Sequence, residues 1–127
     1  MLQLPVPEYL DLLGKPYVRG ARGPDAYDCY GLVKEMFARA GNCVPDFDCP
    51  GTLEEIEALI SDKSRRWRRV PIGTPGALLT FRVDGYGAHV GFMLNGDRFI
   101  HAWESTGVTT ERLTNGLLNP LASYHYG

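Results

Sequence analysis

The sequence lacks several features that define whole classes of protein. Its 127 residues contain no apolar run long enough for a membrane-spanning helix, so we expect no membrane span. Residues 1–8 form neither a basic segment nor an apolar stretch of the secretory kind, so we expect synthesis in the cytoplasm without a signal peptide. There are no repeats and no low-complexity tract, and the length fits a single domain over residues 1–127.

An excess of positive charge is also missing. Thirteen Lys and Arg residues against fifteen Asp and Glu residues give a net charge of −2. Five of the basic residues lie between Lys63 and Arg69, so the rest of the chain is acidic. Proteins that bind nucleic acid are normally basic over a whole face, and we therefore expect no nucleic-acid partner. The basic segment is expected to be a solvated turn, with a site for an anion or a protein partner as the alternative.

Cysteine is scarce, with three residues at Cys29, Cys43 and Cys49. An odd number argues against a disulfide framework. Cys43 and Cys49 have no histidine near them in the sequence, which argues against a zinc site. We expect no metal and no organic cofactor, and ordinary thiols in a reducing compartment fit this pattern. Cys29 differs from the other two because it stands at a predicted helix start.

Helical patterns come first in the chain and strand patterns follow. A short helix is expected at Pro7–Leu13, a second from the cap Asp28 to about Ala40, and a third from Thr52 through Ile60. Strand patterns occupy Ala77–Val83, His89–Leu94, Arg98–Trp103, Val108–Leu113 and, as a possible last strand, Ser123–Tyr126. This order predicts an α+β domain, with N-terminal helices packed on an antiparallel β-sheet meander.

Cys29 lies in the first turn of the second predicted helix, directly after the cap Asp28. The free N–H groups and the positive end of the helix dipole favour a thiolate there, the form of cysteine that attacks carbonyl groups. Gly31 is unusual inside a helix and suggests that another group approaches the helix start closely. The alternative for Cys29 is a small buried side chain that does not react. The Asp28 carboxylate opposes a thiolate beside it, so we interpret Asp28 as a helix cap, a ligand for a substrate amine, or both.

A cysteine nucleophile needs a base and a group that orients the base, and two of the three histidines suit these roles. His89 and His101 lie in consecutive predicted strands joined by Asn95–Asp97. If those three residues form the loop, His101 is a diagonal neighbour of His89 on one face of the sheet. A two-residue loop would send the imidazoles to opposite faces. Satisfied strand histidines are the alternative, and His125 is expected at an edge strand or on the surface.

Four motifs follow one another in the chain: Gly14-Lys15-Pro16-Tyr17, Asp28-Cys29-Tyr30-Gly31-Leu32-Val33, His89-Val90-Gly91 and Phe99-Ile100-His101-Ala102. Together they resemble the NlpC-type cysteine peptidases, papain-like enzymes that cut the peptides of bacterial cell walls. Stretches 19–29 and 101–108 look most like the phage-tail and prophage branch of that family. Two positions depart from its usual pattern. Tyr30 stands where Ser or Trp is common, which would reshape the substrate groove, and Ala77 stands where Asp is usual.

The resemblance implies a papain-like fold and gives five residues a role. Cys29 would be the nucleophile, His89 the base and His101 the group that orients it. Tyr17 would help to stabilise the oxyanion, and Asp28 would bind an amino group of the substrate. The implied substrate is a peptidoglycan stem peptide, cut at the γ-D-glutamyl–diamino acid bond. The expected partners are other phage tail-tip proteins, with the protein in the virion tail and acting at the cell wall. A vestigial structural tail component and an injected antibacterial toxin are the alternatives.

Overall fold

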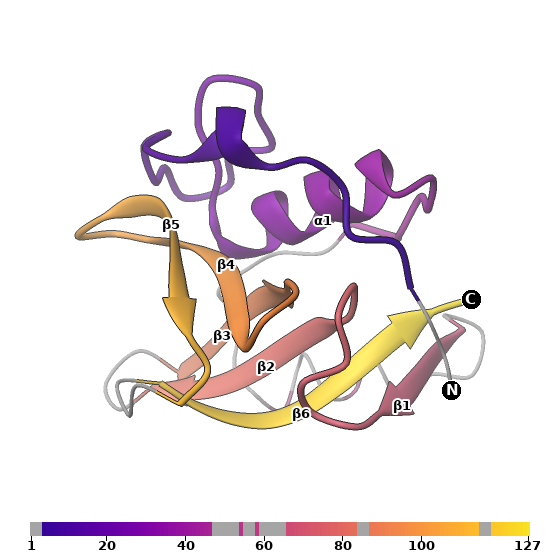
Figure 1. Cartoon of the computed structure of the whole chain (residues 1–127). Coiled ribbons are helices and arrows are strands. Elements are labelled where there is room, and N and C mark those ends of the chain that lie inside the picture. The colour runs from indigo at the N-terminus through magenta and orange to yellow at the C-terminus, as the bar shows by residue number, and fades with distance from the viewer. Residues whose placement is uncertain (1–3, 47–53, 55–57, 59–65, 84–86, 115–117) are drawn as a thin grey trace.

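The architecture is a helix lying across one face of an antiparallel sheet. The computed structural model describes residues 4–46, 54, 58, 66–83, 87–114 and 118–127. The helix α1 (Cys29–Arg39) covers a six-stranded sheet, as Figure 1 shows. The predicted α+β class is confirmed. No helix among the described residues is long and apolar enough to cross a membrane.

The sheet combines a four-stranded meander with a returning strand and one further edge strand. In spatial order its strands are β1 (Trp67–Val70), β6 (Asn119–Tyr126), β2 (Leu78–Val83), β3 (Gly87–Met93), β4 (Arg98–Trp103) and β5 (Gly107–Arg112). Neighbouring strands are antiparallel throughout. The predicted meander is therefore confirmed for β2 to β5. The last predicted strand is also present, and it begins four residues earlier than Ser123, at Asn119.

The helix α1 begins where the sequence predicts. The Asp28 carboxylate accepts a hydrogen bond from the Gly31 backbone N–H at 2.7 Å, which satisfies one of the free amides of the first turn. Gly41 follows the helix end with a φ of +86°, a conformation that suits glycine. The apolar stripe of α1 packs on the sheet, with Phe37 edge-on to Phe92 of β3 at 5.1 Å between ring centroids. In Figure 1 the helix start lies nearest β4, and the helix end lies toward β6 and β1.

The helix predicted at Pro7–Leu13 is wrong in extent. A single 3₁₀ turn, η1 (Leu10–Leu12), forms in its place. Leu12 is buried, whereas Leu10 on the same turn is 67% exposed. The segment therefore lacks the continuous buried face that stabilises a short helix in a protein.

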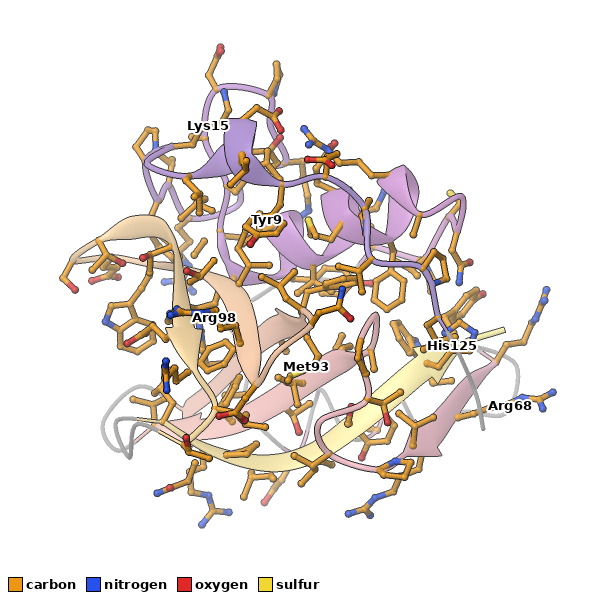
Figure 2. The ribbon with its side chains drawn as sticks, viewed as in Figure 1. Tyr9, Lys15, Arg68, Met93, Arg98 and His125 are labelled. Atoms are coloured by element: carbon orange, nitrogen blue, oxygen red, sulfur yellow. The ribbon has the colours of Figure 1, made fainter. Side chains whose placement is uncertain are left out.

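The basic segment also differs from its prediction as a turn. Trp67–Val70 form the edge strand β1, which pairs with β6. The Trp67 ring packs edge-on against Phe37 at 5.8 Å and against Tyr126 at 5.0 Å, and this burial stabilises a strand among charged residues. The arginines of the strand remain exposed as expected, and Figure 2 shows Arg68 pointing away from the molecule.

Some predictions fall on parts of the chain that the structure does not describe. Residues 63–65 of the basic segment and Cys49 are among them. Most of the helix predicted from Thr52 through Ile60 also lies outside the described residues. Glu54 and Ala58 are described, and both are helical.

Candidate active site

Cys29 is the first residue of α1, and 1% of its surface is exposed. It belongs to the core between the helix and the sheet. The helix packs against β3 and β4, the strands that carry the two predicted catalytic histidines. At this place the helix start offers free N–H groups and the positive end of its dipole to a negatively charged sulfur.

Asp28 is fully buried, and its carboxylate accepts three hydrogen bonds within the protein. Its Oδ1 accepts from the Gly31 backbone N–H and from Arg22 Nη1, each at 2.7 Å, and its Oδ2 accepts from the Gly20 backbone N–H at 3.0 Å. Arg22 bridges further to Asp46 at 2.9 Å. The cap predicted for Asp28 is confirmed, and its charge is balanced by a guanidinium. The contact of Asp28 with a substrate amine stays a prediction.

Gly31 has a packing role. A Cβ at this position would lie 2.2 Å from the Ala21 carbonyl oxygen, a distance that Cβ atoms do not adopt. The same carbonyl accepts the Asp28 backbone N–H at 3.2 Å. The close approach predicted at the helix start is therefore made by the protein's own loop. The absence of a side chain at Gly31 lets this loop hold the residue that precedes Cys29.

Tyr17 lies in a loop that is fastened at both ends. Gly14 N–H donates to the Val108 carbonyl, and Val108 N–H donates to the Lys15 carbonyl, each at 2.9 Å. The residues that flank Tyr17 exchange backbone hydrogen bonds with Tyr27 at 3.1 and 3.2 Å. Tyr17 is half-buried and packs against the helix-side core. Its backbone thus runs beside Tyr27, two residues before Cys29, while its role at an oxyanion stays a prediction.

The structure brings His89 and His101 together as the three-residue loop predicts. Leu94 N–H donates to the Arg98 carbonyl at 2.8 Å, and Phe92 pairs with Ile100 across the hairpin. His89 and His101 consequently share a face, with His89 Nε2 2.8 Å from His101 Nδ1. The odd-length loop predicted for residues 95–97 is confirmed.

Sequence reasoning missed a third group in this row, Glu111 on β5. Its Oε2 lies 2.6 Å from His101 Nε2, on the side of the ring opposite to His89. The Trp103 ring stands edge-on to the His89 ring at 4.7 Å between centroids. A register argument could have found Glu111, because Phe99 of β4 pairs with Glu111 and His101 is two residues further along that strand.

The imidazoles lie on the face of the sheet away from α1. Ala88 and Val90 pack on the helix side, and His89 between them points the other way, toward Phe81. Burial lowers the pKa of His89 well below the ordinary 6.5, and the neighbouring His101 adds to this effect. Burial also lowers the pKa of His101, although Glu111 acts in the opposite direction. Both imidazoles are therefore neutral at pH 7.

A pocket of about 320 Å³ adjoins this row of side chains. It is lined by residues of β2, β4 and β5, of the turn between β4 and β5, and by the residue before β6: Val83, His101, Trp103, Ser105, Thr106, Glu111 and Leu118. It gives solvent or a ligand access to the Glu111 side of the His101 ring. In the described part of the chain, no group of three or more His, Cys, Asp or Glu residues is arranged to hold a metal ion.

The two departures from the family pattern both lie inside the fold. Tyr30 is fully buried, and its hydroxyl donates to the Pro45 carbonyl. A fully buried ring does not itself line a surface groove, and the effect of Tyr30 on the substrate groove stays a prediction. Ala77 is also fully buried, and its carbonyl accepts the Met93 backbone N–H at 2.9 Å.

His125 does not join the site. It lies on β6 opposite Arg68, is half-buried, and stands across the molecule from Arg98 of β4 in Figure 2. Burial lowers its pKa, and the positive charge of Arg68 adds to this effect. The expected position of His125 at an edge strand or on the surface is wrong, because β6 lies between β1 and β2 in the sheet and the side chain is half-buried.

Relatives of the chain point to one family. A probable endopeptidase p60 of Listeria grayi is 29% identical over 106 residues, covering 80% of this chain and 18% of that protein. A murein DD-endopeptidase/murein LD-carboxypeptidase, MepS, of Escherichia coli K12 is 29% identical over 101 residues, covering 80% of this chain and 49% of that protein. The chain thus spans less than half the length of these relatives.

A solved structure shares the fold. The crystal structure of an NLP/P60-family protein from Staphylococcus aureus superposes with a TM-score of 0.64 at 23% identity, covering 91% of this chain and 38% of that one. The model of the NlpC/P60 family matches residues 14–123, which include the helix start and both histidine strands. The chain therefore belongs to the NlpC/P60 family.

Proposed function

We propose that this protein is a cysteine endopeptidase that hydrolyses the stem peptides of peptidoglycan. The observation that carries the proposal is the contact of His89 with His101 on the sheet against which the Cys29 helix packs. These three residues are of the types that a cysteine peptidase needs as nucleophile, base and orienting group. The names of the relatives, endopeptidase p60 and murein endopeptidase, support a cell-wall substrate.

The reaction would proceed through a thioester. The Cys29 sulfur attacks the carbonyl carbon of the scissile amide, and its proton passes to Nδ1 of His89, whose Nε2 is engaged with His101. The C–N bond then breaks, and His89 returns the proton to the leaving amine. A water molecule then attacks the thioester carbonyl while His89 takes its proton; the C–S bond breaks, the sulfur receives that proton from His89, and the carboxylic acid product leaves. Tyr17 and the Cys29 backbone N–H are assigned to the oxyanion.

We propose that the Cys29 thiol and the His89 imidazole come together at the end of the sheet where β3 begins and β4 ends. Cys29 belongs to the helix side of the core, whereas the imidazoles lie on the other face. His89 is near the start of β3, and Trp103, whose ring contacts it, is the last residue of β4. At this end of the strands, a side chain of the helix start and one of the far face can approach the same carbonyl.

The bond we propose is the γ-amide between D-glutamate and the diamino acid, on the strength of the motifs around Cys29 and His89. The test is digestion of purified sacculi, with mass spectrometry of the soluble fragments. Wild type is expected to release fragments ending at γ-D-glutamate, and Cys29→Ala to release none above background. Cys43→Ala, which removes an exposed cysteine outside the site, is the matched control and should retain release. Equal release by wild type and Cys29→Ala would overturn the peptidase proposal, and fragments cut elsewhere would overturn the assigned bond.

We further propose that the protein acts from a phage tail, together with other tail-tip proteins. This rests on the resemblance of stretches 19–29 and 101–108 to the phage-tail branch of the family. Mass spectrometry of purified particles would detect the protein in the tail fraction. Its absence from such particles would reject this mode of delivery and leave the proposed hydrolysis untouched.

A further inference from the structure

Glu111 is the third member of a row of titratable side chains on one face of the sheet. His89, His101 and Glu111 come from β3, β4 and β5, which are adjacent strands. The register pairs His101 with Thr109 and Phe99 with Glu111, so Glu111 is a diagonal neighbour of His101 on the face that also carries His89. The three side chains form a continuous row: His89 Nε2 lies 2.8 Å from His101 Nδ1, and His101 Nε2 lies 2.6 Å from Glu111 Oε2.

The chemistry of these atoms fixes the direction of every hydrogen bond in the row. An ionised carboxylate can only accept, so His101 must donate from Nε2 to Glu111. A neutral imidazole carries one N–H, which leaves His101 Nδ1 as an acceptor. His89 must then donate from Nε2, because that atom faces His101 Nδ1. Its Nδ1 is thereby left without a proton and able to act as a base.

We propose that Glu111 is a positioning residue that sets the tautomers of both histidines, so that His89 Nδ1 is the basic nitrogen of the site. This rests on the proposed peptidase function and extends its machinery by one residue beyond the base and its orienting partner. Without the carboxylate, His101 could carry its proton on either nitrogen. The tautomer protonated at Nδ1 would reverse the bond to His89 and leave His89 protonated at Nδ1, which cannot then accept a proton from a thiol.

The surroundings of Glu111 suit this role. Its side chain is 24% exposed, against 1% for His101, so the carboxylate keeps contact with the pocket beside it while bonding a buried ring. Burial holds both imidazoles neutral at pH 7, which is the condition under which one N–H per ring fixes the chain of bonds. When His89 accepts a proton during the reaction, the negative charge of Glu111 at the far end of the row also stabilises the resulting cation.

The first test reads the tautomers directly. Long-range ¹H–¹⁵N spectra of the imidazoles in wild-type protein at pH 7 are expected to show His89 and His101 both protonated at Nε2. A spectrum with His101 protonated at Nδ1 would overturn the inference. This measurement requires no substrate and no variant. It therefore tests the tautomers that the inference requires even if sacculi are not cut, an outcome that would reject the proposed function alone.

The second test uses Glu111→Gln, which keeps the size of the side chain and removes its charge. The kcat is expected to fall about 10- to 100-fold with little change in KM. Removal of the hydrogen-bond partner of a metal-bound histidine has an effect of this size, and Glu111 orients His101 in the same way. The variant's spectrum should show His101 with a mixture of tautomers. Glu104→Gln removes an exposed carboxylate from the adjoining turn and should leave both kcat and the spectrum as in wild type. Wild-type kcat or unmixed tautomers in Glu111→Gln would refute the assigned role.

Discussion

Replacement of Gly31 by alanine sets two physical effects of opposite sign against each other. On helix propensity alone, Gly31→Ala should stabilise α1 by about 1 kcal/mol. The structure predicts the reverse, because the new Cβ would lie 2.2 Å from the Ala21 carbonyl oxygen and 3.1 Å from Asp28 Oδ1. The first contact involves backbone that cannot rotate away. The loop that carries Ala21 must therefore move, or the helix start must.

The expected loss of stability follows from the hydrogen bonds that the Ala21 carbonyl oxygen accepts. It accepts the Asp28 backbone N–H at 3.2 Å and Arg22 Nη1 at 3.1 Å. Loss of the neutral bond costs about 0.5–1.5 kcal/mol, and loss of the bond from the charged guanidinium about 1.5–3 kcal/mol. After the gain in propensity is subtracted, Gly31→Ala should lower the free energy of unfolding by about 1–3.5 kcal/mol.

Urea unfolding at pH 7 and 25 °C measures this difference. Ala38→Gly is the matched control, since Ala38 is exposed on the same helix and the change measures propensity in the absence of a close contact. It should lower the free energy of unfolding by about 1 kcal/mol. If Gly31→Ala proves as stable as wild type or more so, the close packing of the loop on the helix start is not what determines the residue at this position.

Two further predictions concern buried charge. The pKa values of His89, His101 and His125 are all lowered in the folded protein. Below pH 6.5 the unfolded chain therefore binds more protons than the folded protein. The free energy of unfolding should consequently fall as the pH drops from 6.5 toward the lowered pKa values. Urea unfolding between pH 7.5 and 5 should show a slope of up to about 1.4 kcal/mol per pH unit for each fully buried imidazole, and a flat or opposite profile contradicts the burial argument. Asp28→Ala removes the helix cap and the partner of Arg22, and should cost about 2–4 kcal/mol, whereas Asp28→Asn keeps an acceptor for the helix amide and should cost less. Equal stability of Asp28→Ala and wild type in the same assay would reject the structural role of this carboxylate.

The parts of the site that could be predicted from sequence are those set by local periodicity. The period of two along a strand and the length of one turn were sufficient to place His89 beside His101. The same reasoning extends one strand further. Trp103 pairs with Gly107 across a three-residue turn, and continuing that register places Glu111 on the face of His101. Glu111 was missed because a lone glutamate in a polar strand resembles any solvated residue until its register is worked out.

The parts that could not be predicted depend on contacts distant in the chain. The strand β1 forms because Trp67 packs against Tyr126, fifty-nine residues away, and against Phe37 of α1. A run of arginines around one tryptophan contains no local sign of that partner. Gly31 could be recognised as unusual, but the sequence does not reveal that Ala21 is the group that approaches it.

The neutral imidazoles bear on how the thiol would be activated. A helix start favours a thiolate, but a stable ion pair at rest also requires a protonated His89, and burial opposes that state by lowering its pKa. Asp28 adds little repulsion, since its charge is bonded to Arg22 and to two backbone amides. We infer that His89 is neutral in the resting site and takes up a proton as the sulfur attacks. The low-pH limb of activity should then lie below pH 6.5, at the lowered pKa of His89, and should be visible in kcat/KM measured from pH 4.5 to 8. A limb at or above 6.5 would contradict this order of events.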